Sequence, residues 1–248
     1  MKNLIIVPFH DWRKILLEGF RTRDAHFIEE LKKRQEFSIK VVINRPTTLL
    51  EVFLKRKRNL IKGQVVFSKI NFKLYKLEDN FYIIDYVSYD IFGQIIKGYK
   101  WFISQYGDAK YISFINDCIN FLDMKNNYTF LNQNIFAYKL SESLTPKLSI
   151  FDAWDNFLKF NVYKNILTEI HIGYKAYSKC TDCWITNSRD NVIDFEEAYN
   201  PKHISLITNG VDVIRFVKKK RSVLPSDMIE IKSTNSRVWR KNNSTYRR

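Results

Sequence analysis

Polar residues that could bind a substrate follow several apolar runs of this 248-residue sequence. In each case the run is short and strand-like, and the polar residues come directly after it. The residues concerned are His10, Asp11, Arg13, Asp152, Trp154, Asp155, Asn187, Asn209 and Gly210. If the runs are parallel strands of one sheet, these side chains share one edge, because ligands bind outside the carboxyl ends of such strands.

Several of the candidates have two physical interpretations. Arg13, Arg21 and Arg23 could clamp phosphate groups bidentately, or they could be solvated surface charges. His26 lies on a predicted helix and either contacts a substrate or is a buried, hydrogen-bonded imidazole. Trp154 can stack on the face of a sugar or fill the core as an aromatic side chain.

The cysteines predict no metal site and no disulfide framework. Cys118, Cys180 and Cys183 are too few for a set of bridges. Cys180 and Cys183 have the spacing of a zinc or redox pair, but no second such pair and no HxxxH pattern supplies the other ligands. We therefore expect these residues to be structural.

The positive charge is concentrated near the C-terminus. Of the net +15, residues 218–248 carry +8, from ten lysines or arginines and two acids. The charge alone favours a non-enzymatic nucleic-acid-binding protein, with binding that weakens steeply with salt. Because the rest of the chain is only mildly basic, we expect no nucleic-acid partner. A basic surface is also compatible with an anionic membrane as a peripheral partner.

The order of apolar patterns predicts an α/β fold with a mostly parallel, Rossmann-like wound sheet and helices on both faces. The first strand, Leu4–Val7, is followed by a helical pattern from Thr22 and a second strand, Ile39–Ile43, which together make a βαβ unit. No run of 18 apolar residues occurs, and the N-terminal apolar run is too short for a signal peptide, so we expect a cytoplasmic chain.

Further elements are predicted along the rest of the chain. Helices are expected over residues 47–60, 91–106, 158–179 and 189–199, and Ser188 is a good N-cap for the last of them. Strands are expected at residues 64–67, 72–75, 80–85, 112–114, 132–138, 148–151, 183–186 and 204–207.

Two groups of motifs resemble a known family. Trp184-Ile-Thr-Asn-Ser188, then Asn209-Gly-Val-Asp212 and Arg215-Phe216, resemble the end of the N-terminal domain of retaining GT-B glycosyltransferases. Residues 6–12, residues 21–26 and Phe151-Asp-Ala-Trp-Asp-Asn156 resemble the teichuronic-acid biosynthesis branch of these enzymes. The resemblance covers residues 1 to about 232.

The resemblance implies an acceptor-binding half of a glycosyltransferase that moves a sugar from a nucleotide-activated donor to a cell-surface polysaccharide precursor. The acceptor would be a glycan or a lipid-linked glycan, and no cofactor is implied beyond the donor, which binds with a second domain. It also implies that Asp152 stands where relatives often place a catalytic histidine. A carboxylate there could orient the acceptor hydroxyl or support leaving-group charge. By the same resemblance, Asn209 and Gly210 form a hinge.

The resemblance divides the chain into a domain at residues 1–217, a linker remnant at 218–232 and a disordered tail at 233–248. From Thr234 onward, reading the codons one base downstream permits an apolar strand followed by Gly-Gly-Lys, which is how the second domain of such enzymes opens. We therefore hypothesise a frameshifted gene whose product is inactive alone. A nucleotide-sugar epimerase is a further alternative, but no GxGxxG follows the first strand.

Overall fold

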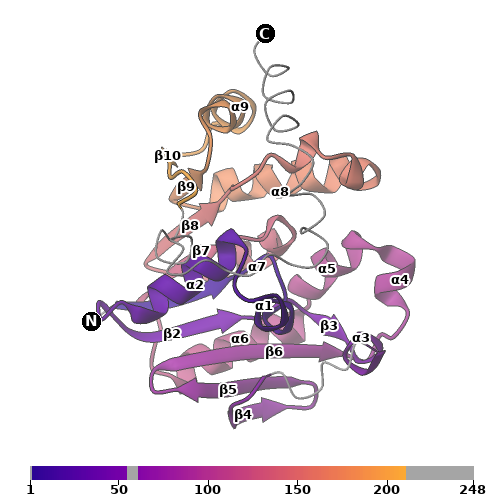
Figure 1. Cartoon of the computed structure of the whole chain (residues 1–248), viewed down its shortest axis with the longest axis vertical. Coiled ribbons are helices and arrows are strands. Elements are labelled where there is room, and N and C mark those ends of the chain that lie inside the picture. Colours follow the sequence, from indigo (N-terminus) through magenta and orange to yellow (C-terminus); the bar gives the residue numbers. More distant parts are fainter. Residues whose placement is uncertain (1, 55–60, 211–248) are drawn as a thin grey trace, which may run out of the picture. The chain divides into compact units, whose positions relative to one another are not determined.

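The computed structural model describes residues 2–54 and 61–210, and its framework is a single wound sheet (Figure 1). The strands lie in the order β10-β9-β8-β7-β1-β2-β6-β5-β4, and β3 pairs with β6. From β10 to β6 every neighbouring pair is parallel, whereas β4 and β5 are antiparallel additions at one side. The mostly parallel, Rossmann-like α/β fold predicted from the sequence is therefore confirmed.

The strands are β1 (Lys2–Val7), β2 (Phe37–Ile43), β3 (Thr47–Thr48), β4 (Gln64–Lys69), β5 (Phe72–Glu78), β6 (Phe81–Ser88), β7 (Tyr128–Asn132), β8 (Leu148–Asp152), β9 (Cys183–Thr186) and β10 (Ile204–Leu206). The helices are α1 (Trp12–Glu18), α2 (Arg23–Lys33), α3 (Leu49–Leu54), α4 (Gly93–Lys97), α5 (Tyr99–Tyr106), α6 (Ala109–Phe121), α7 (Tyr138–Ser143), α8 (Leu167–Cys180) and α9 (Arg189–Tyr199). Short 3₁₀ segments are η1 (Ile135–Ala137), η2 (Phe157–Lys159) and η3 (Asn161–Ile166).

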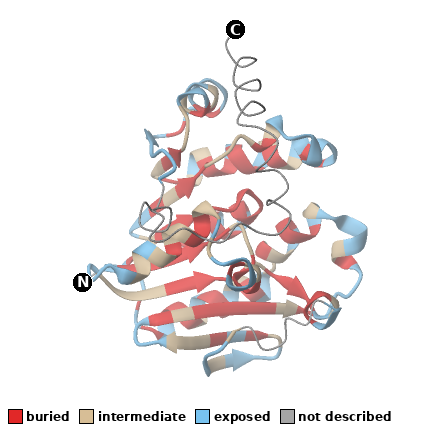
Figure 2. Ribbon diagram, in the orientation of Figure 1, coloured by how far each residue is buried: buried red, intermediate tan, exposed pale blue. Residues whose placement is uncertain are grey.

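Strand β1 is central and is buried on both faces, as its continuous apolar run predicts (Figure 2). Successive side chains of a strand point to opposite faces of the sheet. Leu4 and Ile6 pack in the same cluster as residues of α1 and α2, such as Ile15. Ile5 and Val7 belong to the larger cluster that includes α5, α6, α7 and α8. Helices therefore cover both faces of the sheet.

The strand predicted at residues 112–114 is wrong, because these residues belong to a longer helical pattern. Residues 112–114 lie within α6, whose buried side chains Tyr111, Ile115 and Cys118 recur at helical spacing. Asp108 caps this helix by accepting a hydrogen bond from the backbone N–H of Tyr111 at 2.9 Å. A short apolar run can belong to a strand or to a buried helix, and only the longer pattern distinguishes them.

Other elements differ from prediction at their boundaries. The strand expected at 132–138 is wrong, because β7 ends at Asn132 and the chain then turns through η1 into α7. The helix expected at 91–106 is broken between α4 and α5 at Gly98, which has a φ of 53°. The helix expected at 158–179 begins as η2 and η3 and becomes α8 only at Leu167. The predicted N-cap is present: Ser188 accepts a hydrogen bond from the N–H of Asn191 at 3.2 Å.

The described residues up to Asn209 belong to one compact unit. The expected linker remnant at 218–232 and the expected tail at 233–248 lie outside the described residues. Of the helices described in residues 2–54 and 61–210, none is long and apolar enough to cross a membrane.

Candidate functional site

Residues that follow six parallel strands meet at the carboxyl edge of the sheet. They come after β1, β2, β7, β8, β9 and β10. Side-chain contacts join them in separate groups, of which the largest links the ends of β7, β8 and β10 through Arg23. The residues involved are His10, Asp11, Asn44, Gln133, Asp152, Trp154, Asp155, Asn187 and Asn209. All of these residues lie toward the carboxyl ends of the parallel strands, and their role in binding a substrate stays a prediction.

An ion pair between Arg23 and Asp152 lies at the centre of the site. Arg23, the first residue of α2, donates from Nε to Asp152 Oδ2 at 3.1 Å and from Nη2 to Asp152 Oδ1 at 3.2 Å. Its Nη1 donates to Asn209 Oδ1 at 2.9 Å. The Asp152 side chain is fully buried, and burial raises its pKa although Arg23 opposes the shift. Arg23 is therefore a largely buried, paired cation and not the solvated surface charge that was one of its two interpretations.

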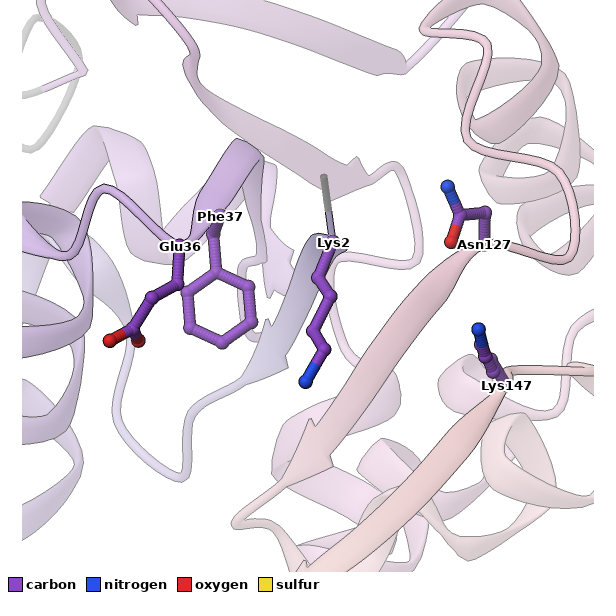
Figure 3. A pocket seen from close by; sticks show the side chains of 5 residues that line it. All are labelled: Lys2, Glu36, Phe37, Asn127 and Lys147. Atoms are coloured by element: carbon purple, nitrogen blue, oxygen red, sulfur yellow. The ribbon is translucent and has the colours of Figure 1, made fainter.

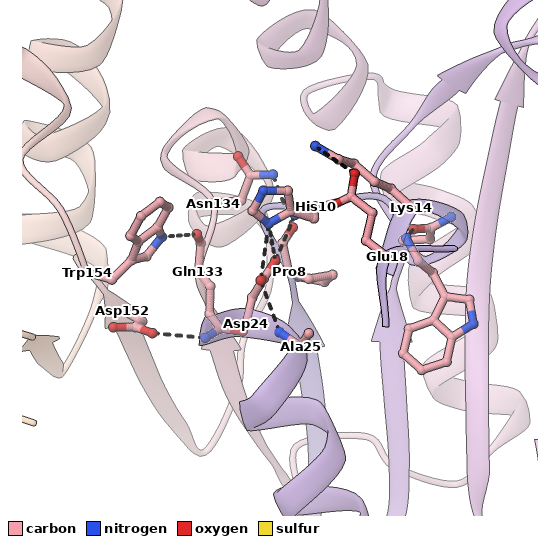
Figure 4. A network of polar contacts seen from close by, with 12 residues as sticks. Pro8, His10, Lys14, Glu18, Asp24, Ala25, Gln133, Asn134, Asp152 and Trp154 are labelled. Atoms are coloured by element: carbon pink, nitrogen blue, oxygen red, sulfur yellow. Dashed lines mark hydrogen bonds and ion pairs between the residues drawn. The ribbon is translucent and has the colours of Figure 1, made fainter. Parts of the chain in front are cut away.

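Gln133 connects this ion pair to Trp154 (Figure 4). Its Nε2 donates to Asp152 Oδ2 at 2.9 Å, and its backbone carbonyl accepts from Trp154 Nε1 at 3.3 Å. Among the described residues, the buried Gln133 Oε1 has no hydrogen-bond partner, and neither has the buried Thr186 Oγ1 at the end of β9. Trp154 packs edge-on against Phe9, and because the residue is only half-buried, part of its surface remains accessible to solvent.

His10 is oriented by Asp24, the second residue of α2 (Figure 4). Its Nδ1 lies 3.0 Å from Asp24 Oδ2, and its backbone N–H donates to the same oxygen at 2.8 Å. The His10 side chain is 21% exposed, whereas that of Asp24 is 3% exposed. When Nδ1 donates to a carboxylate, Nε2 is the nitrogen that can accept a hydrogen bond from a hydroxyl.

Asp24 should make the stability of the domain depend on acidity. Burial opposes its ionisation, but hydrogen bonding and charge interaction with His10 outweigh burial, so the pKa of Asp24 lies below its ordinary value. A lowered pKa gives stability that is present above the ordinary value of 3.8 and is lost as the pH falls through the folded value. We expect Asp24→Asn to lower the free energy of unfolding by about 1–2 kcal/mol at neutral pH.

Urea unfolding of Asp24→Asn and wild type across an acid series checks this expectation. The difference between them should shrink as the pH falls below 3.8. Asp79→Asn is the control, since that side chain is 94% exposed. A difference that stays constant down to the lowest pH would show that the Asp24 carboxylate does not act through its charge.

Asp155 and Asn187 connect the ends of β8 and β9. The Asp155 carboxylate makes a hydrogen bond with the Asn187 side chain, and burial raises the pKa of Asp155 despite that bond. Both residues are half-buried at the rim. A partly accessible carboxylate with a raised pKa, next to an amide, can exchange hydrogen bonds with a polyhydroxyl ligand.

Asp11 and Arg13, which the sequence predicts to bind substrate, are both buried in the interior. Arg13 Nη2 donates to Asp85 Oδ2 at 2.5 Å, and Arg13 Nη1 donates to Asp11 Oδ1 at 3.3 Å. Asn44 Nδ2 donates to both carboxylates, at 2.9 Å to Asp85 and 3.2 Å to Asp11. Burial disfavours the charge of Arg13, but Asp85 and Asp11 outweigh it and raise the Arg13 pKa. These residues hold the loop that presents His10.

The remaining candidates lie at the periphery. The His26 side chain is 44% exposed on α2 and lies 3.9 Å from Glu29, so it is not the buried imidazole that the sequence left open. Arg21 is also exposed, close to Glu18. Asn209 contacts Arg23, and a hinge at Asn209 and Gly210 stays a prediction, since the residues after Gly210 lie outside the described chain.

A cavity of about 590 Å³ lies at the opposite, amino edge of the sheet (Figure 3). Its lining residues come from the starts of β1, β2, β7 and β8 and are Lys2, Glu36, Phe37, Asn127 and Lys147. No sequence-predicted site residue lines it. Over the described ranges, no group of three or more His, Cys, Asp or Glu residues could hold a metal ion.

Comparison with known proteins establishes the fold. No protein-family model matches the chain, and no curated protein matches its sequence. The apo structure of OtsA matches with a TM-score of 0.52 and 8% identity, over 94% of this chain and 55% of that chain. A trehalose-6-phosphate structure from E. coli bound with UDP-2-fluoro glucose matches with a TM-score of 0.52 and 8% identity, over 93% and 54%.

The chain spans about half the length of each of these two structures. The likeness shows that the fold is a Rossmann-like domain of the GT-B type.

Proposed function

We propose that this domain is the acceptor-binding half of a GT-B glycosyltransferase that uses a nucleotide-activated sugar. The observation that carries the proposal is the polar cluster at the carboxyl edge of the sheet, where Arg23 and Gln133 hold Asp152 and Trp154 lies beside them. The UDP-2-fluoro glucose bound in a neighbour of the same fold supports nucleotide-sugar chemistry. A retaining mechanism and a cell-surface polysaccharide precursor as acceptor are carried over from the sequence resemblance.

The site residues take distinct roles in this proposal. Trp154 offers the accessible part of its ring to a sugar face, and His10 Nε2 accepts a hydrogen bond from an acceptor hydroxyl. Asp155 and Asn187 bind further hydroxyls at the rim. Asp152, held by Arg23, fixes the position of Gln133, whose backbone carbonyl in turn accepts a hydrogen bond from Trp154. Catalysis by such a site works through positioning.

Sugar binding tests the proposal directly. Saturation-transfer NMR with a panel of monosaccharides and oligosaccharides should show binding by the wild-type chain. Trp154→Ala should weaken it about tenfold, which corresponds to about 1.4 kcal/mol. Phe121→Ala, which removes an exposed ring on α6, should leave binding unchanged. No binding by the wild-type chain, or equal binding by Trp154→Ala, would contradict the proposal.

The proposal assigns no donor-binding role to residues 2–210. We therefore expect binding of acceptor-type sugars without transfer from any nucleotide sugar when the chain is tested alone. Measured transfer would refute this assignment. A gel-shift assay covers the nucleic-acid alternative, which requires tight binding of DNA or RNA at physiological salt.

A further inference from the structure

Two segments expose large apolar side chains beside each other, on α3 and on the stretch from Tyr89 through α4. Six of these side chains are between 58% and 78% exposed. They are Phe53, Leu54, Tyr89, Phe92, Ile95 and Ile96, which we call the α3–α4 apolar surface. Single exposed apolar residues are ordinary, but a contiguous group marks an interaction surface.

The pairing of β3 with β6 brings the two segments together. Thr48 pairs with Ser88, and α3 begins at the next residue after Thr48. Tyr89 is the next residue after Ser88, so both segments leave the sheet at one point. Figure 1 shows α3 and α4 beyond the carboxyl end of β6, and Figure 2 shows exposed residues over α4.

The short helix α4 is held in place although its apolar side chains face solvent. Asp90 Oδ1 accepts a hydrogen bond from the Gly93 N–H at 2.9 Å, and Asp90 Oδ2 accepts from Trp101 Nε1 at 3.1 Å. Trp101 is fully buried in α5. A Cβ at Gly93 would meet Asp90 Oδ2 at 1.8 Å, so only glycine fits beneath this cap. The exposure of Ile95 and Ile96 is therefore a feature of an anchored element.

The sequence around this surface is strongly basic. Residues 47–62 and 89–100 contain seven lysines or arginines and two acids. Both acids are engaged within the fold, since Glu51 accepts a hydrogen bond from Thr47 and Asp90 caps α4. Of the basic residues, Lys100 is paired with Glu169. The sequence directly after Leu54 reads Lys-Arg-Lys-Arg. Apolar side chains among basic ones are complementary to the interface of a bilayer with anionic headgroups.

We propose that the α3–α4 apolar surface docks on a membrane that contains anionic lipid. Strands β1, β2 and β6 are parallel, so this surface lies at the same edge of the sheet as His10 and Asp152. A docked domain would present its acceptor site toward the bilayer. Provided that the proposed function holds, the acceptor class is then a lipid-linked glycan.

Vesicle flotation tests the docking without any sugar or donor. The full chain should float with vesicles of phosphatidylcholine containing one third phosphatidylglycerol and should bind pure phosphatidylcholine much more weakly. Ile95→Ser combined with Ile96→Ser should lower the partition coefficient about tenfold. Ile172→Ser combined with Ile193→Ser is the matched control, because it removes two exposed isoleucines from α8 and α9 and should retain wild-type binding.

Circular dichroism of each variant verifies that it is folded, as expected for exposed positions. Failure of the wild-type chain to float, or equal losses in both double variants, would overturn the docking proposal. A third result would also overturn it: the wild-type chain self-associates, the Ile95→Ser, Ile96→Ser variant does not, and neither binds vesicles. A second copy of the chain would then cover the surface. The flotation assay contains no sugar, so a negative result would not affect the proposed acceptor site. Sugar binding measured by NMR tests that site separately.

Discussion

Arg13→Met is expected to lower the free energy of unfolding by about 3–5 kcal/mol, since it breaks a buried ion network. The variant keeps much of the side-chain volume but removes the cation that Asp11 and Asp85 share. Both carboxylates are buried, and Asn44 alone cannot balance their charge. Urea denaturation followed by far-ultraviolet circular dichroism measures the loss.

Lys14→Met is the matched control for this experiment. Lys14 is the next residue on α1, and its ammonium lies 3.8 Å from the exposed Glu18 carboxylate. An exposed pair of this kind contributes about 0–1 kcal/mol. If the two variants lose similar stability, the network around Arg13 does not support the fold as described.

Asp152→Asn is expected to have the second largest effect, because it removes the charge that holds Arg23. We expect a loss of about 2–3 kcal/mol of unfolding free energy, together with weaker sugar binding. Gln133 and Arg23 would each lose a charge-assisted hydrogen bond. Asp194→Asn, in the exposed pair with Lys159, should cost less than about 1 kcal/mol.

A double-mutant cycle isolates the Arg23–Asp152 contact from other effects. The variant carrying both Arg23→Met and Asp152→Asn should lose less stability than the two single variants lose together, because either change alone already breaks the pair. Equal and additive losses would mean that the bidentate geometry contributes no coupling, and that Asp152 acts only through Gln133.

The framework of the fold could be predicted because its signals are local and redundant. The run Leu4–Val7 predicted a strand buried on both faces, and that strand lies at the centre of the sheet. Ser188 predicted the start of α9, because its hydroxyl can accept a hydrogen bond from the first turn of a helix. By contrast, residues 112–114 were ambiguous because two apolar residues, Ile112 and Phe114, are too few to distinguish the period of a strand from that of a helix. Only the surrounding spacing, from Tyr111 to Cys118, identifies α6.

The site could be predicted only in part, since its pairings depend on contacts between distant residues. The edge of the sheet followed from the strand ends, but the partners did not. Asp24 has the local signature of an acid in the first turn of a helix, which does not reveal its contact with His10, 14 positions away. Arg23 reaches Asp152 across 129 positions. Gln133 carried no signal, because the sequence placed it inside a strand at residues 132–138, whereas β7 ends at Asn132.

Burial was the other property that local patterns did not reveal. Asp11 and Arg13 have the composition of an exposed loop, and nothing near them in the sequence identifies Asp85 as their partner. The ion network therefore became visible only when β6 was placed two strands away from β1. Charged residues become fully buried only when partners compensate them, and such partners are seldom neighbours in sequence.

The acceptor-site assignment is tested most directly by recording backbone amide NMR spectra while an oligosaccharide that binds the chain is added stepwise. The account predicts that chemical shifts change at His10, at Trp154 with Asp155, and at Asn187, all at the carboxyl edge of the sheet. Changes at Lys2, Phe37, Asn127 and Lys147 instead would move the ligand to the cavity at the amino edge and would contradict the assignment.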